Sequence, residues 1–232
     1  IDEMPPGRMP VETKVFRESA RERVYRIVEE EVRKGRQVFI VYPLVEGSEK
    51  LDLKDATRMA EHLQKEVYPE FRIGLLHGRV KSDEKEAIMM EFKEGKIQIL
   101  VATTVIEVGI DIPNASVMVV EHAERFGLSQ LHQLRGRIGR GRYPSKCILL
   151  AQYRASEEAR VRLQAMERTT DGFQIAEEDL ALRGPGEFFG VRQSGFPDFR
   201  VAHLVRDTPI LIEARDSEEH TSELQSHLNL VC

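Results

Sequence analysis

The chain has 232 residues, of which 41% are hydrophobic and 31% charged, and its formal net charge is -5. This composition is typical of a globular protein and excludes collagen-like and disordered classes. Two cysteines are too few for a disulfide framework or a structural zinc cluster. No apolar run approaches the ~20 residues that would span a bilayer. The negative net charge excludes a generally basic surface that would bind nucleic acid all over.

The chain opens on a proline-rich stretch without an initiator methionine or a secretory signal. We therefore expect residues 1–15 to be a linker in a chain that begins inside a longer protein. Behind it, helical and strand patterns alternate. Apolar residues at helical spacing predict helices at 16–34, 56–67, 83–92 and 128–138. Continuous apolar runs predict strands at 38–44, 71–76, 97–102, 117–121 and 147–150. The alternation indicates an α/β fold with a doubly wound parallel sheet and right-handed crossovers.

The strand patterns stop after Ala151. Helices are expected at 156–168 and 172–182, followed by the glycine-rich loop RGPGEFFGVRQSG, so a helical hairpin and loop should follow the sheet. The stretch 217–227 is polar and aperiodic and matches the translation of a sequencing-library adapter. We expect 216–232 to be a non-native tail, with an ordinary acidic helix end as the alternative.

Ligands of open α/β sheets bind beyond the carboxyl ends of the strands, so residues that leave the strands are the first site candidates. The backbone N–H groups and hydroxyls there can hold phosphates without reading bases. The candidates are His77, Gly78 and Arg79 after one strand and Thr103 and Thr104 after another. A loop histidine that caps a helix is an equally good interpretation of His77.

The exit loop TTVIEVGIDIP holds a glycine and an aspartate. Gly109 lets the backbone approach a ligand, and Asp111 can accept hydrogen bonds from hydroxyls. Without further context, a structural turn is the better interpretation of this loop.

The segment QLHQLRGRIGRG gives a sharper signal, because four arginines and three glycines alternate within it: Arg135, Gly136, Arg137, Gly139, Arg140, Gly141 and Arg142. Arg137 and Arg140 are three residues apart, so on a helix and its exit they would share a face and present two forks to phosphate oxygens. The alternative is a basic helix face that is simply exposed to solvent. Glycine lowers helix stability by up to ~1 kcal/mol per position, and a solvent-exposed basic face has no use for the glycines. The pattern favours a triphosphate site.

The stretch from Leu100 to Gly141 resembles motifs V and VI of superfamily 2 helicases, with the QxxGRxGR core that runs from Gln133 to Arg140. The block GFQIAEEDLALRGPGEFFGVRQSG resembles the translocation motif shared by RecG-type branched-DNA helicases and transcription-repair coupling translocases. The segment PLVEGSEKLDLKDA and the RQSG ending favour the RecG type. The resemblance covers residues 1–215.

The resemblance implies a RecA-like helicase domain 2 at 16–151, preceded by an inter-lobe linker at 1–15 and followed by a translocation hairpin and loop at 152–215. It implies that Arg137 and Arg140 are arginine fingers for the γ-phosphate of ATP, oriented by Gln133. Three groups of further roles follow from it: nucleotide contacts at Gly109, Asp111 and Gly136; DNA contacts at His77, Gly78, Arg79, Thr103 and Thr104; and translocation coupling at Arg183, Arg192 and Gln193. A plain surface connector is the alternative for the glycine-rich loop.

No G-x-x-x-x-G-K-[ST] motif occurs in the chain. The phosphate-binding loop and the Mg²⁺ ligands are therefore expected in an N-terminal motor lobe outside this chain, no metal ligands are expected within it, and the fragment alone should not hydrolyse ATP.

The expected function is that of the second motor domain of an ATP-dependent DNA helicase that remodels stalled forks and Holliday junctions in recombination and repair. Its expected partners are branched DNA, the N-terminal motor lobe and a junction-binding domain, in a monomer of the bacterial cytoplasm and nucleoid without membrane contact. A coupling-translocase fragment is the nearest alternative. A non-catalytic nucleic-acid-binding module is disfavoured by the net acidity, and a dinucleotide-dependent oxidoreductase by the absence of G-x-G-x-x-G after the first strand.

Overall fold

The computed structural model describes residues 11–43, 49–103, 112–152 and 155–183. The chain forms two compact units, residues 1–176 and 177–232, and the first of them contains the whole sheet. In the second unit, residues 177–183 continue a helix that begins at Gly172. None of the described helices is long and apolar enough to cross a membrane.

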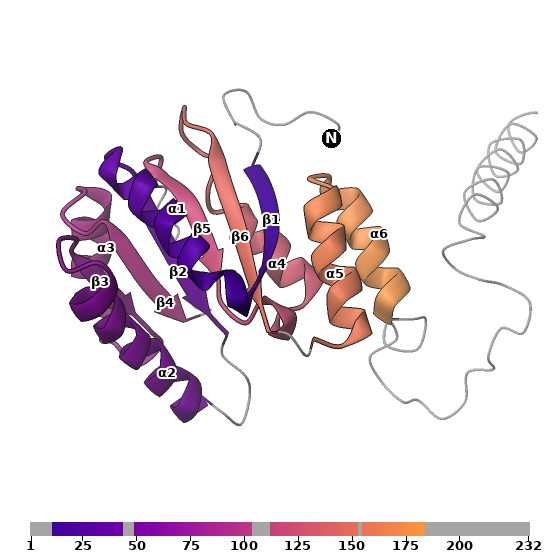
Figure 1. The fold of residues 1–232 in the computed structure, drawn as a ribbon, viewed down its shortest axis with the longest axis horizontal. Coiled ribbons are helices and arrows are strands. Elements are labelled where there is room, and N and C mark those ends of the chain that lie inside the picture. Colours follow the sequence, from indigo (N-terminus) through magenta and orange to yellow (C-terminus); the bar gives the residue numbers. More distant parts are fainter. Residues whose placement is uncertain (1–10, 44–48, 104–111, 153–154, 184–232) are drawn as a thin grey trace, which may run out of the picture. The chain divides into compact units, whose positions relative to one another are not determined.

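The sheet has six strands, β1 (Val11–Arg17), β2 (Gln37–Tyr42), β3 (Ile73–Leu76), β4 (Ile99–Thr103), β5 (Ala115–Val120) and β6 (Ser145–Ala151). Their order across the sheet is β1-β6-β5-β2-β4-β3, and every neighbouring pair is parallel (Figure 1). Strands β2, β4 and β5 are buried along their whole length, as expected for parallel strands covered on both faces. The expected α/β fold with a parallel sheet is confirmed.

Strand β1 was not expected from the sequence. Residues 11–15, which the sequence analysis placed in a linker, pair in register with β6 from Val11 opposite Ser145 to Arg17 opposite Ala151. The assignment of 11–15 to a linker is therefore wrong. Only Thr13 and Phe16 of β1 are buried, because it lies at the side of the sheet, and so it lacks the continuous apolar run of the central strands. The helix expected from residue 16 begins at Arg21 instead.

The described residues also form six helices, α1 (Arg21–Arg33), α2 (Glu49–His62), α3 (Ser82–Lys93), α4 (Leu128–Arg135), α5 (Glu157–Arg168) and α6 (Gly172–Arg183). Short turns lie at Glu18–Ala20, Leu63–Val67 and Ala123–Arg125. Helices α1 and α2 share one buried cluster with Ile40 and its neighbours on that face. Phe39 points to the opposite face, where its ring meets Phe92 of α3 edge-on at 4.9 Å between ring centres.

Side chains cover backbone N–H groups on both outer strands. On β1, the N–H of Val15 donates to Glu167 of α5 at 2.7 Å. Beside β3, Gln64 accepts from the N–H of Ile73 at 3.0 Å and donates to the carbonyl of Phe71 at 2.8 Å. These contacts occupy groups that an added strand would need.

Candidate nucleotide and DNA site

The parallel sheet has two distinct ends. All six strands run the same way, so one end collects the last residues of the strands and the other collects their first residues. A strand of six residues spans about 20 Å, which separates the two ends. His77 and Arg79 follow β3, and Thr103 is the last residue of β4, so these residues lie at the carboxyl end.

The predicted arginine pair lies at the opposite, amino end. Helix α4 begins after β5 and runs back along the sheet, so residues 136–144, here called the arginine loop, lead directly into the start of β6. Arg137 and Arg140 therefore do not lie with the candidates that follow the carboxyl ends of β3 and β4. The helix expected to reach residue 138 ends at Arg135, with Gly136 as its cap. Both arginines lie beyond the helix, so the argument from a shared helical face does not apply.

The arginine loop is held at several points. The side chain of Ile138 is fully buried, and Gly139 adopts φ +75°, a conformation that favours glycine. Gly141 lies so close to the carbonyl of Pro113 that a Cβ at this position would overlap the oxygen. The ring of Tyr143 is covered by the guanidinium of Arg36 at 4.3 Å from the ring centre. The loop thus begins with the turn hydrogen bonds from the N–H groups of Arg137 and Ile138 to the carbonyls of Leu134 and Arg135, and packing holds it beyond that turn.

The loop carries positive charge toward the outside. Arg140 is exposed, and its Nε donates to the carbonyl of Gly136 at 3.2 Å. Arg137 is half-buried and has no ion-pair partner within the described ranges, and Gln133 is exposed on the last turn of α4. Guanidinium groups presented in this way suit an anion with several oxygens, such as a phosphate.

Arg135 behaves differently from the other arginines of the segment. It is only 4% exposed, and it donates to the carbonyls of Met166, Thr169 and Thr170 at 3.0, 2.8 and 3.3 Å. These carbonyls lie at and just beyond the end of α5, where helical carbonyls lack intrahelical partners. Burial lowers the pKa of Arg135. This residue joins α4 to α5 and takes no part in an exposed basic surface.

The sequence contains a signal that identifies Arg135 as buried. Leu128 and Leu131 face the interior from α4, and Arg135 follows Leu131 by four residues, so it belongs to the same helical face. Composition alone could not separate it from its exposed neighbours.

The predicted DNA contacts at the carboxyl end differ in their exposure. Thr103 is 1% exposed, and its hydroxyl has no hydrogen-bond partner among the residues that the structure describes. Gly78 and Arg79 are exposed, whereas His77 is half-buried and its Nδ1 accepts from the N–H of Arg79 at 3.2 Å. Burial, with Lys85 and Arg79 nearby, lowers the pKa of His77. The histidine thus caps its own turn, and Arg79 is the accessible cation of this group.

A polar network that the sequence analysis did not predict occupies the same end of the sheet. Buried Glu121, directly after β5, receives both guanidinium nitrogens of Arg21 at 2.7 and 2.8 Å. The next residue, His122, has a left-handed backbone (φ 49°) and pairs with Glu124 at 3.8 Å. The carboxylates of Glu124 and Glu121 raise the pKa of His122. The sequence feature that could have indicated this network is Glu121, an acidic residue directly after an apolar strand.

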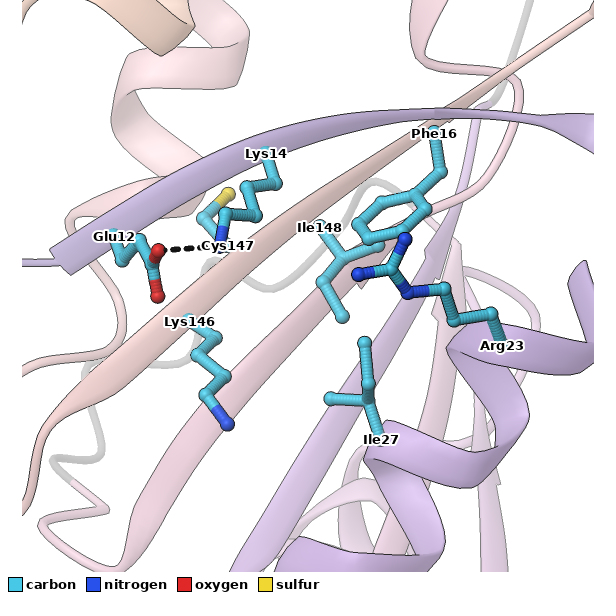
Figure 2. Close-up of a pocket in the computed structure, with 8 residues that line it drawn as sticks. All are labelled: Glu12, Lys14, Phe16, Arg23, Ile27, Lys146, Cys147 and Ile148. Carbon is cyan, nitrogen blue, oxygen red and sulfur yellow. Dashed lines mark ion pairs between the residues drawn. The ribbon is translucent and has the colours of Figure 1, made fainter. Parts of the chain in front are cut away.

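A cavity of about 110 Å³ has none of the predicted site residues in its lining (Figure 2). It is lined by Glu12, Lys14, Phe16, Arg23, Ile27, Lys146, Cys147 and Ile148. Its lysines are neutralised within the chain, because Lys14 pairs with Glu12 at 2.6 Å and Lys146 with Glu31 at 3.1 Å. Burial raises the pKa of the Cys147 thiol to about 12, so the thiol stays protonated and unreactive at neutral pH.

Several predicted residues lie outside the described residues, namely Thr104, Gly109, Asp111, Arg192 and Gln193. Arg183 is the last residue of α6. Within the described ranges, no group of three His, Cys, Asp or Glu side chains could hold a metal ion.

Comparison with known proteins places this architecture in a family. The model of the helicase conserved C-terminal domain matches residues 19–142, so the chain belongs to this class of helicase motor domains. A second model, the C-terminal part of domain 3 of the ATP-dependent DNA helicase RecG, matches residues 169–230. The chain is a member of the RecG family. The second match includes most of the residues 216–232 that the sequence analysis set apart.

The relatives agree with this assignment. The ATP-dependent DNA helicase RecG of Synechocystis is 55% identical to the chain, over 94% of the chain and 26% of the relative. The ATP-dependent DNA helicase RecG of Thermotoga maritima is 52% identical, over 100% of the chain and 30% of the relative. A solved structure of RecG bound to a three-way DNA junction is 50% identical, with a TM-score of 0.69, over 90% of the chain and 27% of that protein. The chain thus spans about a third or less of the length of these relatives.

Proposed function

We propose that the chain is the second motor domain and translocation element of an ATP-dependent DNA helicase that remodels branched DNA, including stalled forks and Holliday junctions. The names of the relatives support ATP-dependent helicase activity, and the structure of one of them with a three-way junction supports branched DNA as the substrate. The observation that carries the proposal is the arginine loop, which holds guanidinium groups outward at one end of the sheet in a chain without a phosphate-binding loop of its own. Such a surface is one wall of a site that a second lobe completes.

At the amino end, Arg137 and Arg140 would contact the γ-phosphate of ATP and stabilise the charge that develops on its oxygens during hydrolysis. Gln133, Gly136, Gly109 and Asp111 would contribute nucleotide contacts. Mg²⁺, held by the N-terminal lobe, would neutralise the phosphates. Because the loop is fixed before the nucleotide arrives, little reorganisation is needed when the two lobes close.

At the carboxyl end, exposed Gly78 and Arg79 would hold DNA phosphates, together with His77, Thr103 and Thr104. The chain between Thr103 and Ile112 leaves β4 at the carboxyl end and precedes β5 at the amino end. It is therefore one of the covalent connections between the two ends, and it contains Gly109 and Asp111. Arg183, Arg192 and Gln193 would pass the motion of the lobes to the duplex.

The intact protein would work as a monomer at the bacterial nucleoid, with its own N-terminal motor lobe and a junction-binding domain as partners. The chain alone, which lacks the phosphate-binding loop, should not hydrolyse ATP. The nearest alternative, a coupling translocase, is not favoured by the relatives.

The test is the DNA-stimulated ATPase of a full-length helicase that carries this chain, measured with a three-way junction. Arg140→Ala should lower kcat about 1000-fold, because an arginine finger acts in the transition state, while the affinity for the junction stays within two-fold. Arg142→Ala removes an exposed arginine from the same loop and is the matched control. An unchanged kcat in Arg140→Ala would contradict the proposed role of the loop.

A further inference from the structure

The start of β2 and the end of the arginine loop are joined by a chain of charged and aromatic contacts. Glu31, near the end of α1, is 3% exposed and pairs with Arg36 at 3.4 Å, Lys34 at 3.0 Å and Lys146 at 3.1 Å. Burial opposes the ionisation of Glu31, but Lys34 and Lys146 hold its pKa below the ordinary value, so this carboxylate is ionised. The guanidinium of Arg36 is thereby held on the ring of Tyr143 at 4.3 Å.

Tyr143 lies two residues before β6, near the end of the arginine loop. Two points where the loop packs closely, Ile138 and Gly141, lie on either side of Arg140. Tyr143 is 38% exposed, so apolar burial holds it only in part, and the guanidinium of Arg36 covers its ring. A stacked guanidinium contributes about 0.5–1 kcal/mol at an exposed site and more where it is desolvated. The side chain of Arg36 is only 18% exposed.

We infer that Arg36 and Tyr143 are positioning residues for the proposed arginine fingers: their stack, anchored on Glu31, keeps the arginine loop in the conformation that presents Arg140. The inference rests on the proposed function. Neither residue touches the nucleotide in this scheme. Each acts through the path of the loop, and a displacement of about 1 Å is enough to reduce catalysis strongly.

A matched stack elsewhere in the chain supplies the control. Arg33, three residues before Arg36, lies over the ring of Phe71 at 5.6 Å and pairs with Glu29 at 2.8 Å and Glu70 at 3.0 Å. It combines the same kinds of contact at the end of α1 but does not touch the arginine loop. Replacing Arg33 therefore removes an arginine–aromatic stack without affecting the loop.

The first measurement is amide hydrogen exchange of residues 137–143 in the chain itself. Arg36→Ala and Tyr143→Ala should each speed exchange in the loop about ten-fold, whereas Arg33→Ala should leave it unchanged. Tyr143→Phe keeps the ring and should restore the protection. Unchanged exchange in both alanine variants would overturn the inference, and so would equal loosening by Arg33→Ala.

The second measurement is ATP hydrolysis by the full-length helicase. Tyr143→Ala should lower kcat about ten-fold with the KM for ATP within two-fold, because the fingers act in the transition state, and Tyr143→Phe should retain the kcat of the parent. A loosened loop with unchanged kcat would overturn the positioning role. If Arg140→Ala lowers kcat and Tyr143→Ala does not, only this inference fails. If Arg140→Ala itself has no effect, the proposed function of the loop fails, and the positioning role fails with it.

Discussion

The two ends of the sheet handle charge in opposite ways. At the carboxyl end, Arg21 is neutralised by Glu121 and His122 pairs with Glu124, so these charges are balanced within the chain. At the amino end, Arg140 is exposed and Arg137 has no ion-pair partner in the part of the chain that the structure describes. Exposed guanidinium groups suit an anion with several oxygens, such as a phosphate. The proposed function assigns such an anion to the amino end, whereas the ion pairs of Arg21 and His122 at the carboxyl end lie within the fold.

The contrast has a counterpart within one segment. Arg135 and Arg140 are five residues apart, yet the first donates to three carbonyls of the fold and the second is exposed. The environment that each backbone position provides, rather than the residue type, separates the buried arginine from the exposed one.

The largest expected effect tests this separation. Arg135→Met should lower the free energy of unfolding by about 3 kcal/mol, because it leaves buried carbonyls at the end of α5 without donors. Urea unfolding of the chain measures the loss. Arg160→Met, which removes an exposed arginine paired only with Glu157, should change stability by less than about 0.5 kcal/mol. Equal losses in the two variants would remove the distinction.

A smaller effect is expected at the carboxyl end. Arg79→Ala in the full-length helicase should weaken binding to a three-way junction about five-fold and reduce the slope of log affinity against log salt by about one, because one phosphate contact is lost. At saturating DNA, kcat should remain unchanged. Fluorescence anisotropy at several salt concentrations measures the affinity, with exposed Lys93→Ala as the control. A change in kcat without a change in affinity would mean that the two ends do not divide the work as proposed.

The smallest effect concerns His122, whose pKa is raised in the folded chain. Protonation therefore favours folding: the stabilisation is fully present below the unfolded pKa of about 6.5 and is lost as the pH rises through the folded pKa. His122→Asn tolerates the left-handed backbone and should remove about 0.5 kcal/mol of this pH dependence. Urea unfolding at pH 5.5 and 8.5 provides the comparison. An unchanged difference between the two pH values would show that the histidine does not contribute.

The sequence predicted the fold well where burial leaves a strong pattern. Central strands such as β2 and β5 are apolar at nearly every position, and the sequence identified both. Strand β1 has a mixed pattern because its burial is partial, and the prolines before it suggested a linker. A strand at the side of a sheet is specified by its partner as much as by its own residues.

The site was harder to predict because its location depends on chain direction. The sequence singled out Arg137 and Arg140, and their catalytic role stays a prediction. Their place in the fold depends on the return path of α4, which brings the loop to the start of β6. The partner of Glu121 is Arg21, which lies 100 residues away along the chain, so no local pattern could have indicated this pair.

The side-chain contacts on β1 and β3 have a consequence for how this protein meets other molecules. With Glu167 and Gln64 occupying backbone groups of the outer strands, lateral growth of the sheet by pairing with another polypeptide is hindered at both flanks. Edge-to-edge aggregation through these two positions is disfavoured for the same reason.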